Sequence, residues 1–327
     1  MKFAWTESFM SEESLVRERW EGEGEILFFE SPAHEIDLDD LGDEILLSIR
    51  THTKLDDTSM DSVRAVISRS TGYDHLRGKS YDCPVGYLPE YATEAVADHV
   101  IGVSMYLLRK LGRARESMET FERQNLTGRE LSGRTVGIVG AGNIGKRAAE
   151  MFSGIGSDVF AHDIEPAHDW ARSHGISYVD LDELFQTCDL VVLTLPNTRD
   201  TGFLIKEGHL REMPSRSILV NAGRGEVVRN QALVGALKEG PVEAMALDVV
   251  NREQDLASHL RGETGYSESD ELDHALELLN HSHVIMTPHN AFNTEEAVER
   301  KVQKTLDNFK YFLEEDRVLD PVPDQTK

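Results

Sequence analysis

The sequence contains little cysteine and no long apolar run. Only Cys83 and Cys188 occur in 327 residues, too few for a disulfide framework or a thiolate metal cage. We therefore expect no metal site and a reducing, cytoplasmic environment. The longest largely apolar stretch, residues 100–108, is shorter than the ~20 residues of a membrane-spanning helix. The first residues show no basic start followed by an apolar segment, so no signal peptide is expected.

Basic residues are also scarce relative to acidic ones. The chain has 34 Lys and Arg against 59 Asp and Glu, a formal net charge of -25. Such a surface repels phosphate backbones and anionic lipid head groups, which argues against nucleic acid and membrane partners. The same balance suits a saline cytoplasm, although ordinary acidic enzymes share it. An anionic ligand would need local positive groups.

Short β-branched runs alternate with helical patterns from Arg134 to about Thr287. This alternation predicts an α/β fold with a doubly wound parallel sheet. Helical spacing of apolar residues marks 145–152, 181–187 and 231–237. The expected strands are Thr135–Val139, Asp158–His162, Leu190–Leu195, Ser217–Val220, Val242–Leu247 and His283–Met286.

The first hundred residues form a separate, smaller α/β pattern. Its expected strands are 25–30 and 65–68, and 11–20 reads as an acidic helix. Three more helices are expected: one at 92–113 that leads into the second pattern, one at 272–279 within a polar excursion, and an amphipathic one at 294–313 that docks on the first pattern.

The clearest motif directly follows the strand Thr135–Val139. It matches G-x-G-x-x-G and leads into a helical pattern. The first glycine would permit a tight turn, the second a close approach of pyrophosphate, and the third close helix packing. The helix amides and dipole would then bind the phosphates. This predicts a dinucleotide site at Gly140, Gly142, Asn143, Ile144 and Gly145.

Asp163 ends the next expected strand, about twenty residues further on. Its carboxylate could accept hydrogen bonds from a ribose hydroxyl and would repel a 2′-phosphate. No Arg follows it immediately. The sequence therefore favours NAD over NADP, with a solvated strand end as the ordinary alternative.

Polar residues after later strands are further candidates, because open α/β sheets bind ligands outside the carboxyl ends of their strands. Arg224 lies between two glycines, which suits a guanidinium that binds a carboxylate through two hydrogen bonds. Glu253 and His289 follow two further strands. Singly, the three could be a surface charge, a loop acid and a core histidine. Together they favour a catalytic site.

These three residues suit the reduction of a 2-keto acid. His289 would donate a proton, Arg224 would hold the carboxylate and polarise the ketone, and Glu253 would hydrogen-bond the imidazole and favour its protonated form. NADH would supply the hydride. Leu195 and Pro196, at another strand end, would line the cofactor site.

From about Ser68 to Thr294 the chain resembles the D-isomer-specific 2-hydroxyacid dehydrogenase family. The resemblance rests on Asn221–Gly225, Leu247–Glu253 and Thr287–His289. It implies that Asp248 lies near the nicotinamide and that Ala222 and Gly223 line it. It further implies that the turn containing Thr71 and Gly72 binds the substrate carboxylate. Tyr87 falls near the substrate-facing position of the family, although a packing role suits it equally.

The resemblance also implies a discontinuous, flavodoxin-like substrate domain, a Rossmann domain, NAD as cofactor, a catalytic cleft between the domains and a homodimer. The boundaries expected are 1–98 with 292–327 for the substrate domain and 99–291 for the NAD-binding domain. The long acidic segment after Glu253 is more similar to D-lactate dehydrogenases than to glyoxylate reductases. The stretch 76–84 is shorter than usual in the family, and Asp98 stands where Glu is commoner.

Two other readings fit the same motifs. One is an NAD-sensing interaction protein resembling the C-terminal-binding corepressors, which would bind peptides and turn over slowly. The other is a dehydrogenase of a divergent substrate such as phosphite. Steady-state turnover of NADH with a panel of 2-keto acids distinguishes them.

Overall fold

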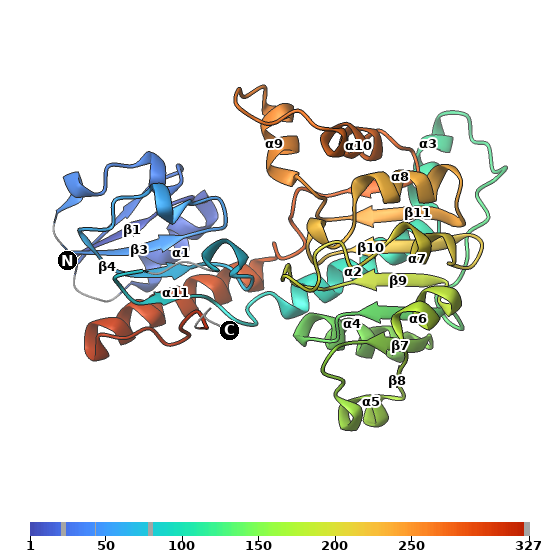
Figure 1. Cartoon of the computed structure of the whole chain (residues 1–327), viewed down its shortest axis with the longest axis horizontal. Coiled ribbons are helices and arrows are strands. Elements are labelled where there is room, and N and C mark those ends of the chain that lie inside the picture. Colours follow the sequence, from blue (N-terminus) through green and yellow to red (C-terminus); the bar gives the residue numbers. More distant parts are fainter. Residues whose placement is uncertain (21–23, 43, 78–80, 324–327) are drawn as a thin grey trace. The chain divides into compact units, whose positions relative to one another are not determined.

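The computed structural model describes residues 1–20, 24–42, 44–77 and 81–323. The chain forms two compact units (Figure 1): a smaller unit of Met1–Ala92 with Asn293–Lys327, and a larger unit of Thr93–Phe292. Both contain a parallel sheet with helices, which confirms the predicted α/β fold class. The domain boundary predicted after residue 98 falls inside helix α2 (Thr93–Leu108).

The smaller unit is built on a five-stranded sheet of order β2-β1-β3-β4-β5, parallel throughout. Helices α1 (Met10–Arg19) and α11 (Glu295–Glu315) pack against each other. Phe309 of α11 contacts the rings of Phe3 and Trp5. The strands are β1 (Lys2–Trp5), β2 (Glu25–Phe28), β3 (Ile45–Ile49), β4 (Val63–Ser68) and β5 (Val85–Gly86).

The strand side chains that do not face α1 and α11 pack under loops and single-turn helices. Ala4, Ile45 and Val66 belong to this second cluster. It is covered by the short 3₁₀ helices Ala33–Glu35, Asp39–Leu41, Leu55–Asp57 and Asp74–Leu76. Sequence patterning placed β2, β4 and α1 within two residues but missed β1 and β3. Residues 78–80 of the predicted short stretch lie outside the described residues.

The larger unit has a seven-stranded parallel sheet of order β12-β11-β10-β9-β6-β7-β8. The chain runs outward from β6 to β8 and returns to the other side of β6 at β9, so the order reverses between β6 and β9. Such a reversal is where open α/β sheets bind ligands. The strands are β6 (Thr135–Val139), β7 (Asp158–His162), β8 (Ser177–Tyr178), β9 (Leu190–Leu193), β10 (Ser217–Asn221), β11 (Val242–Leu247) and β12 (Val284–Met286).

Helices cover both faces of this sheet, as a doubly wound fold requires. One core cluster packs α2 and α4 (Asn143–Ile155) against the sheet through Val100 and Phe152. The other contains Leu184, Leu210, Leu233 and Leu272. These belong to α6 (Leu181–Thr187), α7 (Glu207–Arg211), α8 (Asn230–Lys238) and α10 (Asp270–Leu279); α5 (His168–His174) precedes β8.

The helix expected at 92–113 is broken in two. Helix α2 ends at Leu108, Lys110 has a φ of +53°, and α3 spans Leu111–Glu116. The carbonyl oxygen of Leu108 accepts a hydrogen bond from the amide of Arg129 at 2.8 Å, so the returning loop completes the end of α2. Two further predictions were wrong in detail: β9 ends at Leu193 rather than 195, and an unpredicted helix, α9 (Glu253–Arg261), begins at Glu253.

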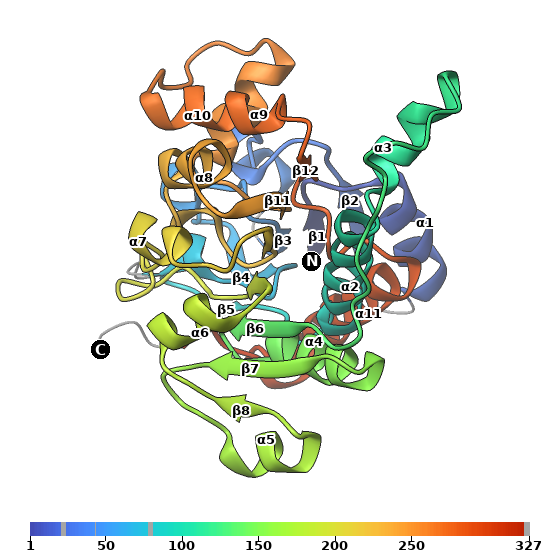
Figure 2. The ribbon, with the colours of Figure 1, turned by 90° about the vertical axis from the view of Figure 1, so that its right-hand side faces the viewer.

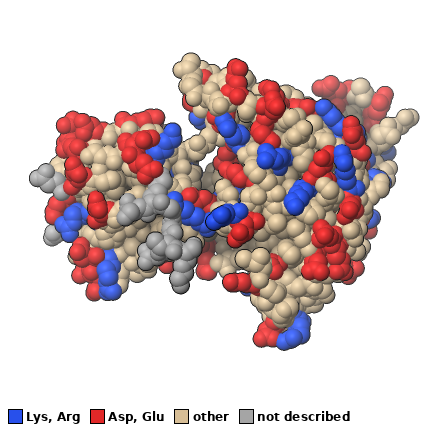
Figure 3. All heavy atoms as spheres, in the orientation of Figure 1, with Lys and Arg blue, Asp and Glu red and all other residues tan. Residues whose placement is uncertain are grey.

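No helix in the described part of the chain is both long and apolar enough to cross a membrane. Acidic side chains are spread over the face shown in Figure 3, with basic side chains among them. The high negative charge is therefore distributed over this face rather than confined to one segment.

Candidate active site

The predicted cofactor and catalytic residues of the larger unit follow the carboxyl ends of six strands. In the spatial order β12, β11, β10, β9, β6 and β7, the residues are His289, then Asp248 and Glu253, then Arg224, then Leu195 and Pro196, then Gly140 to Gly145, and finally Asp163. The order reversal of the sheet lies next to the glycine loop. One edge of one sheet thus carries every site residue predicted in this unit.

The glycine loop has the geometry that its sequence predicts. Gly140 adopts a φ of +95°, and a Cβ added to Gly145 would lie 2.0 Å from the carbonyl oxygen of Gly140. A Cβ on Gly142 would meet nothing within 4 Å, so the protein's own packing does not require glycine there. Gly142 is also the N-cap of α4 and has no side chain to cap that helix. Open space beside an uncapped helix N-terminus fits a pyrophosphate.

Asp163 braces the same loop. Its Oδ2 accepts a hydrogen bond from the amide of Ala141 at 2.7 Å, and its Oδ1 accepts one from the amide of Glu165 at 2.9 Å. A carboxylate can accept further hydrogen bonds, since each oxygen has two lone pairs. Asp163 is therefore placed beside the glycine loop with capacity to bind a ribose hydroxyl.

Leu195 connects the glycine loop to the next strand end. It is 9% exposed, and a Cβ on Gly223 would lie 2.6 Å from its carbonyl oxygen. The amide of Ala222 donates to the carbonyl of Leu193 at 3.0 Å. The segment of Leu195 thus packs against both the glycine loop and the Ala222–Gly223 backbone that leads to Arg224.

His289 and Glu253 contact each other directly. Nδ1 of His289 lies 2.8 Å from Oε1 of Glu253, and each side chain is about one third exposed. A carboxylate only accepts, so Nδ1 carries the proton in this pair. Glu253 is the first residue of α9, where the helix dipole favours a negative charge. Because Nδ1 is paired with Glu253, Nε2 is the ring nitrogen available for proton transfer.

Asp248 holds the loop that carries His289. Its carboxylate, 5% exposed, accepts hydrogen bonds from Thr287 Oγ1 at 2.5 Å and from the amides of Asn290 and Ala291 at 2.8 and 3.0 Å. The amide of His289 donates to the Asp248 carbonyl at 2.9 Å. These bonds fix His289 at a φ of +48°, a left-handed conformation that costs about 1–3 kcal/mol in a residue other than glycine. The family resemblance implied only cofactor binding for Asp248.

Arg224 lies in a loop braced from β10. Asn221 Nδ2 donates to the carbonyl of Arg224 at 3.1 Å, and Arg224 Nη1 donates to the carbonyl of Gly223 at 2.9 Å. A Cβ on Gly225 would lie 2.0 Å from the backbone of Val250, so this loop packs closely on the segment that leads to Glu253. The loops bearing Arg224, Glu253 and His289 are thus packed or hydrogen-bonded to one another in series.

Sequence reasoning missed a buried polar cluster behind Glu253. Asn230 Nδ2 donates to the carbonyls of Asn251 and Glu271 at 2.9 and 2.8 Å, and Asn251 Nδ2 donates to Glu271 Oε2 at 3.1 Å. These bonds tie the segment before α9 to α8 and α10. The only sequence signal was an Asn at the start of an apolar helix, a position where capping is the ordinary expectation.

The predicted substrate residues Thr71, Gly72 and Tyr87 belong to the smaller unit. Thr71 Oγ1 donates to the Leu88 carbonyl at 3.1 Å. The Gly72 carbonyl accepts a 2.8 Å bond from the Ser70 hydroxyl. Tyr87 packs on Tyr73 with ring centroids 4.9 Å apart, and burial, together with the nearby Tyr73, raises the pKa of Tyr87. The turn is well braced, and Tyr87 has the packing contact that its ordinary reading implied.

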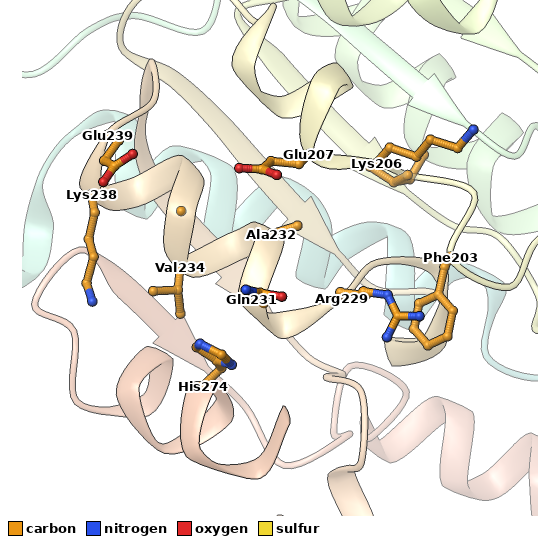
Figure 4. Close-up of a pocket in the computed structure, with 12 residues that line it drawn as sticks. Phe203, Lys206, Glu207, Arg229, Gln231, Ala232, Val234, Lys238, Glu239 and His274 are labelled. Atoms are coloured by element: carbon orange, nitrogen blue, oxygen red, sulfur yellow. The ribbon is translucent and has the colours of Figure 1, made fainter. Parts of the chain in front are cut away.

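A surface hollow of about 380 Å³ lies elsewhere on the larger unit, over α8 and α10. Arg229 stacks on Phe203 there at 4.0 Å, and His274 lies beside Val234 (Figure 4). No predicted site residue lines it. It lies on the helix layer, so it is not the candidate active site.

Residues 101–291 match the NAD binding domain of the D-isomer specific 2-hydroxyacid dehydrogenase family. The match covers more than half of the chain and includes the glycine loop and the residues from Arg224 to His289.

Comparisons with individual proteins agree with this match. The chain is 33% identical to a D-lactate dehydrogenase of Curvularia clavata over 251 residues, 75% of this chain and 70% of the relative. It is 31% identical to the D-lactate dehydrogenase of Escherichia coli over 259 residues, 78% and 77% of the two chains. The crystal structure of an Aquifex aeolicus D-lactate dehydrogenase complexed with NAD and lactic acid superposes with a TM-score of 0.81 at 25% identity, covering 96% of each chain.

Proposed function

The chain belongs to the D-isomer specific 2-hydroxyacid dehydrogenase family, on its D-lactate dehydrogenase-like branch, and we propose that His289, Glu253 and Arg224 carry its reaction. As a member it is an NAD-dependent enzyme that interconverts a D-2-hydroxy acid and the 2-keto acid. The observation that carries the proposal is the 2.8 Å contact between His289 and Glu253 beside the Arg224 loop.

In the direction of reduction, bound NADH supplies the hydride to the carbonyl carbon. His289 Nε2 donates the proton that the carbonyl oxygen needs to become a hydroxyl, and Glu253 stabilises the imidazolium from which that proton comes. In the reverse direction the same nitrogen accepts the hydroxyl proton. The fixed Nδ1 contact keeps Nε2 aimed at one point, so the proton transfer needs no rotation of the ring.

Arg224 binds the substrate carboxylate through two hydrogen bonds and polarises the ketone. The turn at Thr71 and Gly72 supplies backbone amides to the same carboxylate, and Tyr87 borders the substrate side chain. The glycine loop, Asp163, Leu195 and Pro196 bind NAD. Ala222, Gly223 and Asp248 lie at its nicotinamide end. The bracing of the turn and of the Arg224 loop supports these assignments, because preorganised donors are more effective.

NADH oxidation followed at 340 nm with pyruvate, glyoxylate, hydroxypyruvate and bulkier 2-keto acids tests the proposal. The wild-type enzyme should reduce at least one of them, and His289→Ala should lower that rate at least about 100-fold with NADH affinity unchanged. His174→Ala, a change of an exposed histidine on α5, is the matched control. A His289→Ala rate near wild type would assign the proton donor to another residue.

We further propose a homodimer formed through the end of α2 and the arm made of residues 111–121, which contains α3. Met105, Tyr106 and Leu111 are more than one third exposed, and Met118 and Phe121 are 64% and 66% exposed. Figures 1 and 2 show α3 and the following loop standing away from the sheet of the larger unit. Exposed apolar side chains on an arm of this kind favour association. Light scattering should give a dimer mass, and Phe121→Asp with Met118→Asp should give a monomer.

The cellular setting is part of the same proposal. Two unpaired cysteines suit a reducing cytoplasm, and the net charge of -25 disfavours nucleic acid as a partner. Fractionation of cells that express the chain would test the first point, and a gel-shift assay at low salt the second.

A further inference from the structure

A group of charged side chains is completely buried at the carboxyl edge of the smaller sheet. Arg69 follows β4 and is 1% exposed, while Glu12 of α1 and Lys301 of α11 are 0% exposed. Glu12 pairs with Lys301, lies 3.6 Å from Arg69 Nε, and accepts a 3.1 Å hydrogen bond from the indole of Trp5. None of the three charged residues has a role in the proposed reaction.

The guanidinium of Arg69 joins three chain segments. Nη1 donates to the Ser48 hydroxyl of β3 at 2.6 Å, and Nη2 donates to the backbone carbonyls of Thr6 and Glu7, which follow β1. The Arg69 amide donates to the carbonyl of Ile49 at 2.8 Å. The guanidinium also stacks on Trp5, with its Cζ 4.6 Å from the ring centroid. The ends of β1, β3 and β4 are therefore fixed by one side chain.

Stability alone does not explain such a group, because apolar residues of similar volume often stabilise a core as well as buried ion pairs do. Ion pairs with several directed hydrogen bonds instead specify one geometry. The residues that follow Arg69 are Ser70, Thr71 and Gly72. The far side of this turn is held by the Leu88 amide, which donates to the Ser70 carbonyl at 3.1 Å. Arg69 is thus the near anchor of the turn.

We propose that Arg69 is a positioning residue for substrate binding: its buried guanidinium, paired with Glu12, fixes the 70–72 turn so that the turn amides face the substrate carboxylate. This inference rests on the proposed role of that turn. Arg69 does not touch substrate. Its effect is on how well the turn is preorganised, so it acts on keto-acid affinity and leaves the proton chemistry of His289 unchanged.

The test compares Arg69→Met and Arg69→Lys with Arg64→Met in the full-length enzyme. Arg64 lies on β4, the strand that Arg69 follows, but its guanidinium is exposed and pairs with Glu44 and Asp316 at the surface. Lysine keeps the charge but cannot reach Ser48 and the Thr6 and Glu7 carbonyls together. The measurements are KM and kcat for pyruvate, or for the best acid of the panel, the Kd of NADH, and the Kd of oxamate, an unreducible 2-keto-acid isostere.

Both Arg69 variants should raise KM and the oxamate Kd at least about tenfold, since misplacing a binding group by about 1 Å costs up to about 100-fold. The Kd of NADH should stay within about twofold, and Arg64→Met should match wild type. Wild-type KM in a folded Arg69→Lys or Arg69→Met enzyme would overturn the inference.

If neither Arg69 variant folds, Ser48→Ala provides the test. This change removes only the hydroxyl that accepts the hydrogen bond from Nη1 of Arg69. An unchanged oxamate Kd in Ser48→Ala would then overturn the inference, and a several-fold increase would support it. Failure of the proposed function looks different: the wild-type enzyme would reduce no 2-keto acid, or His289→Ala would retain full activity, whatever the Arg69 variants do.

Discussion

Glu253 begins α9 and, through Oε1, lies 2.8 Å from Nδ1 of His289, so one carboxylate serves both a helix N-terminus and an imidazole. The helix N-terminus favours the negative charge, and the carboxylate orients the ring through Nδ1. Neither partner is deeply buried, which leaves the ring accessible to a substrate.

Replacing Glu253 by Gln should reduce the keto-acid reduction rate about 10- to 100-fold, because the amide keeps a hydrogen bond but no longer favours the charged ring. The loss should be in kcat. Stopped-flow NADH oxidation measures it. Glu263→Gln, at an exposed position just beyond α9, serves as the control. Equal rates in the two variants would remove Glu253 from the mechanism.

Replacing Arg224 by Lys should reduce kcat/KM for the keto acid about 100-fold or more, since an ammonium group cannot make the planar, two-bond contact with a carboxylate. The Kd of NADH should change little. Arg211→Lys on α7, where Arg211 forms an exposed pair with Glu207, is the matched control. A KM unchanged in Arg224→Lys would show that another cation holds the substrate.

Replacing Asp163 by Asn should raise the kcat/KM ratio of NADPH to NADH at least about tenfold. The amide oxygen can still accept the bond from Ala141, so the loop brace is retained while the charge that repels a 2′-phosphate is lost. Steady-state kinetics with both cofactors give the ratio. If the ratio does not move, cofactor choice is determined elsewhere.

Acid should destabilise the smaller unit through Glu7 and Glu12. Burial alone would raise the pKa of Glu12, but the charges of Arg69 and Lys301 outweigh it and lower the pKa from about 4.5 to about 2. Burial alone would likewise raise the pKa of Glu7. Hydrogen bonds from His52, Thr53 and the Arg50 amide outweigh burial and lower this pKa to about 2. A carboxyl with a depressed folded-state pKa stabilises the fold above about pH 4.5, and that contribution is lost as pH falls toward 2.

Each of the two groups should account for up to about 3 kcal/mol of this loss. Urea unfolding followed by tryptophan fluorescence at pH 7, 5 and 3 measures it. Glu12→Gln should lower stability at pH 7 and flatten the acid dependence, whereas Glu44→Gln at the surface should do neither. The same acid slope in both variants would contradict the assignment.

The features that the sequence predicted well depend on neighbours in the chain. The glycine loop requires only a strand, three glycines and a helix in succession, so its geometry followed from local pattern. Arg224 and His289 could be placed because parallel strands end at one edge of a sheet. Predicting where they lie on this edge requires only the ends of the strands. The predicted ends of β10 and β12 agree with the structure within one residue.

The features that the sequence did not predict depend on distant partners. Asp248 holds the 287–291 loop through bonds to residues about forty positions away, and nothing local distinguishes it from a cofactor ligand. Arg69 resembles a surface residue at a strand end, since its partner Glu12 and the Lys301 that pairs with the same carboxylate come from opposite ends of the chain. The strand β1 was missed because four residues show too little alternation for a pattern.

The smaller unit draws its core from both ends of the chain, with Phe3 and Trp5 resting on Phe309. During synthesis on the ribosome, β1 emerges first but cannot complete its packing until α11 has been made. The larger unit, continuous from Thr93 to Phe292, can assemble in the meantime. A nascent chain released before residue 295 would therefore carry a finished nucleotide-binding half beside an exposed aromatic sheet face, which is the form that chaperones and proteases would be expected to engage.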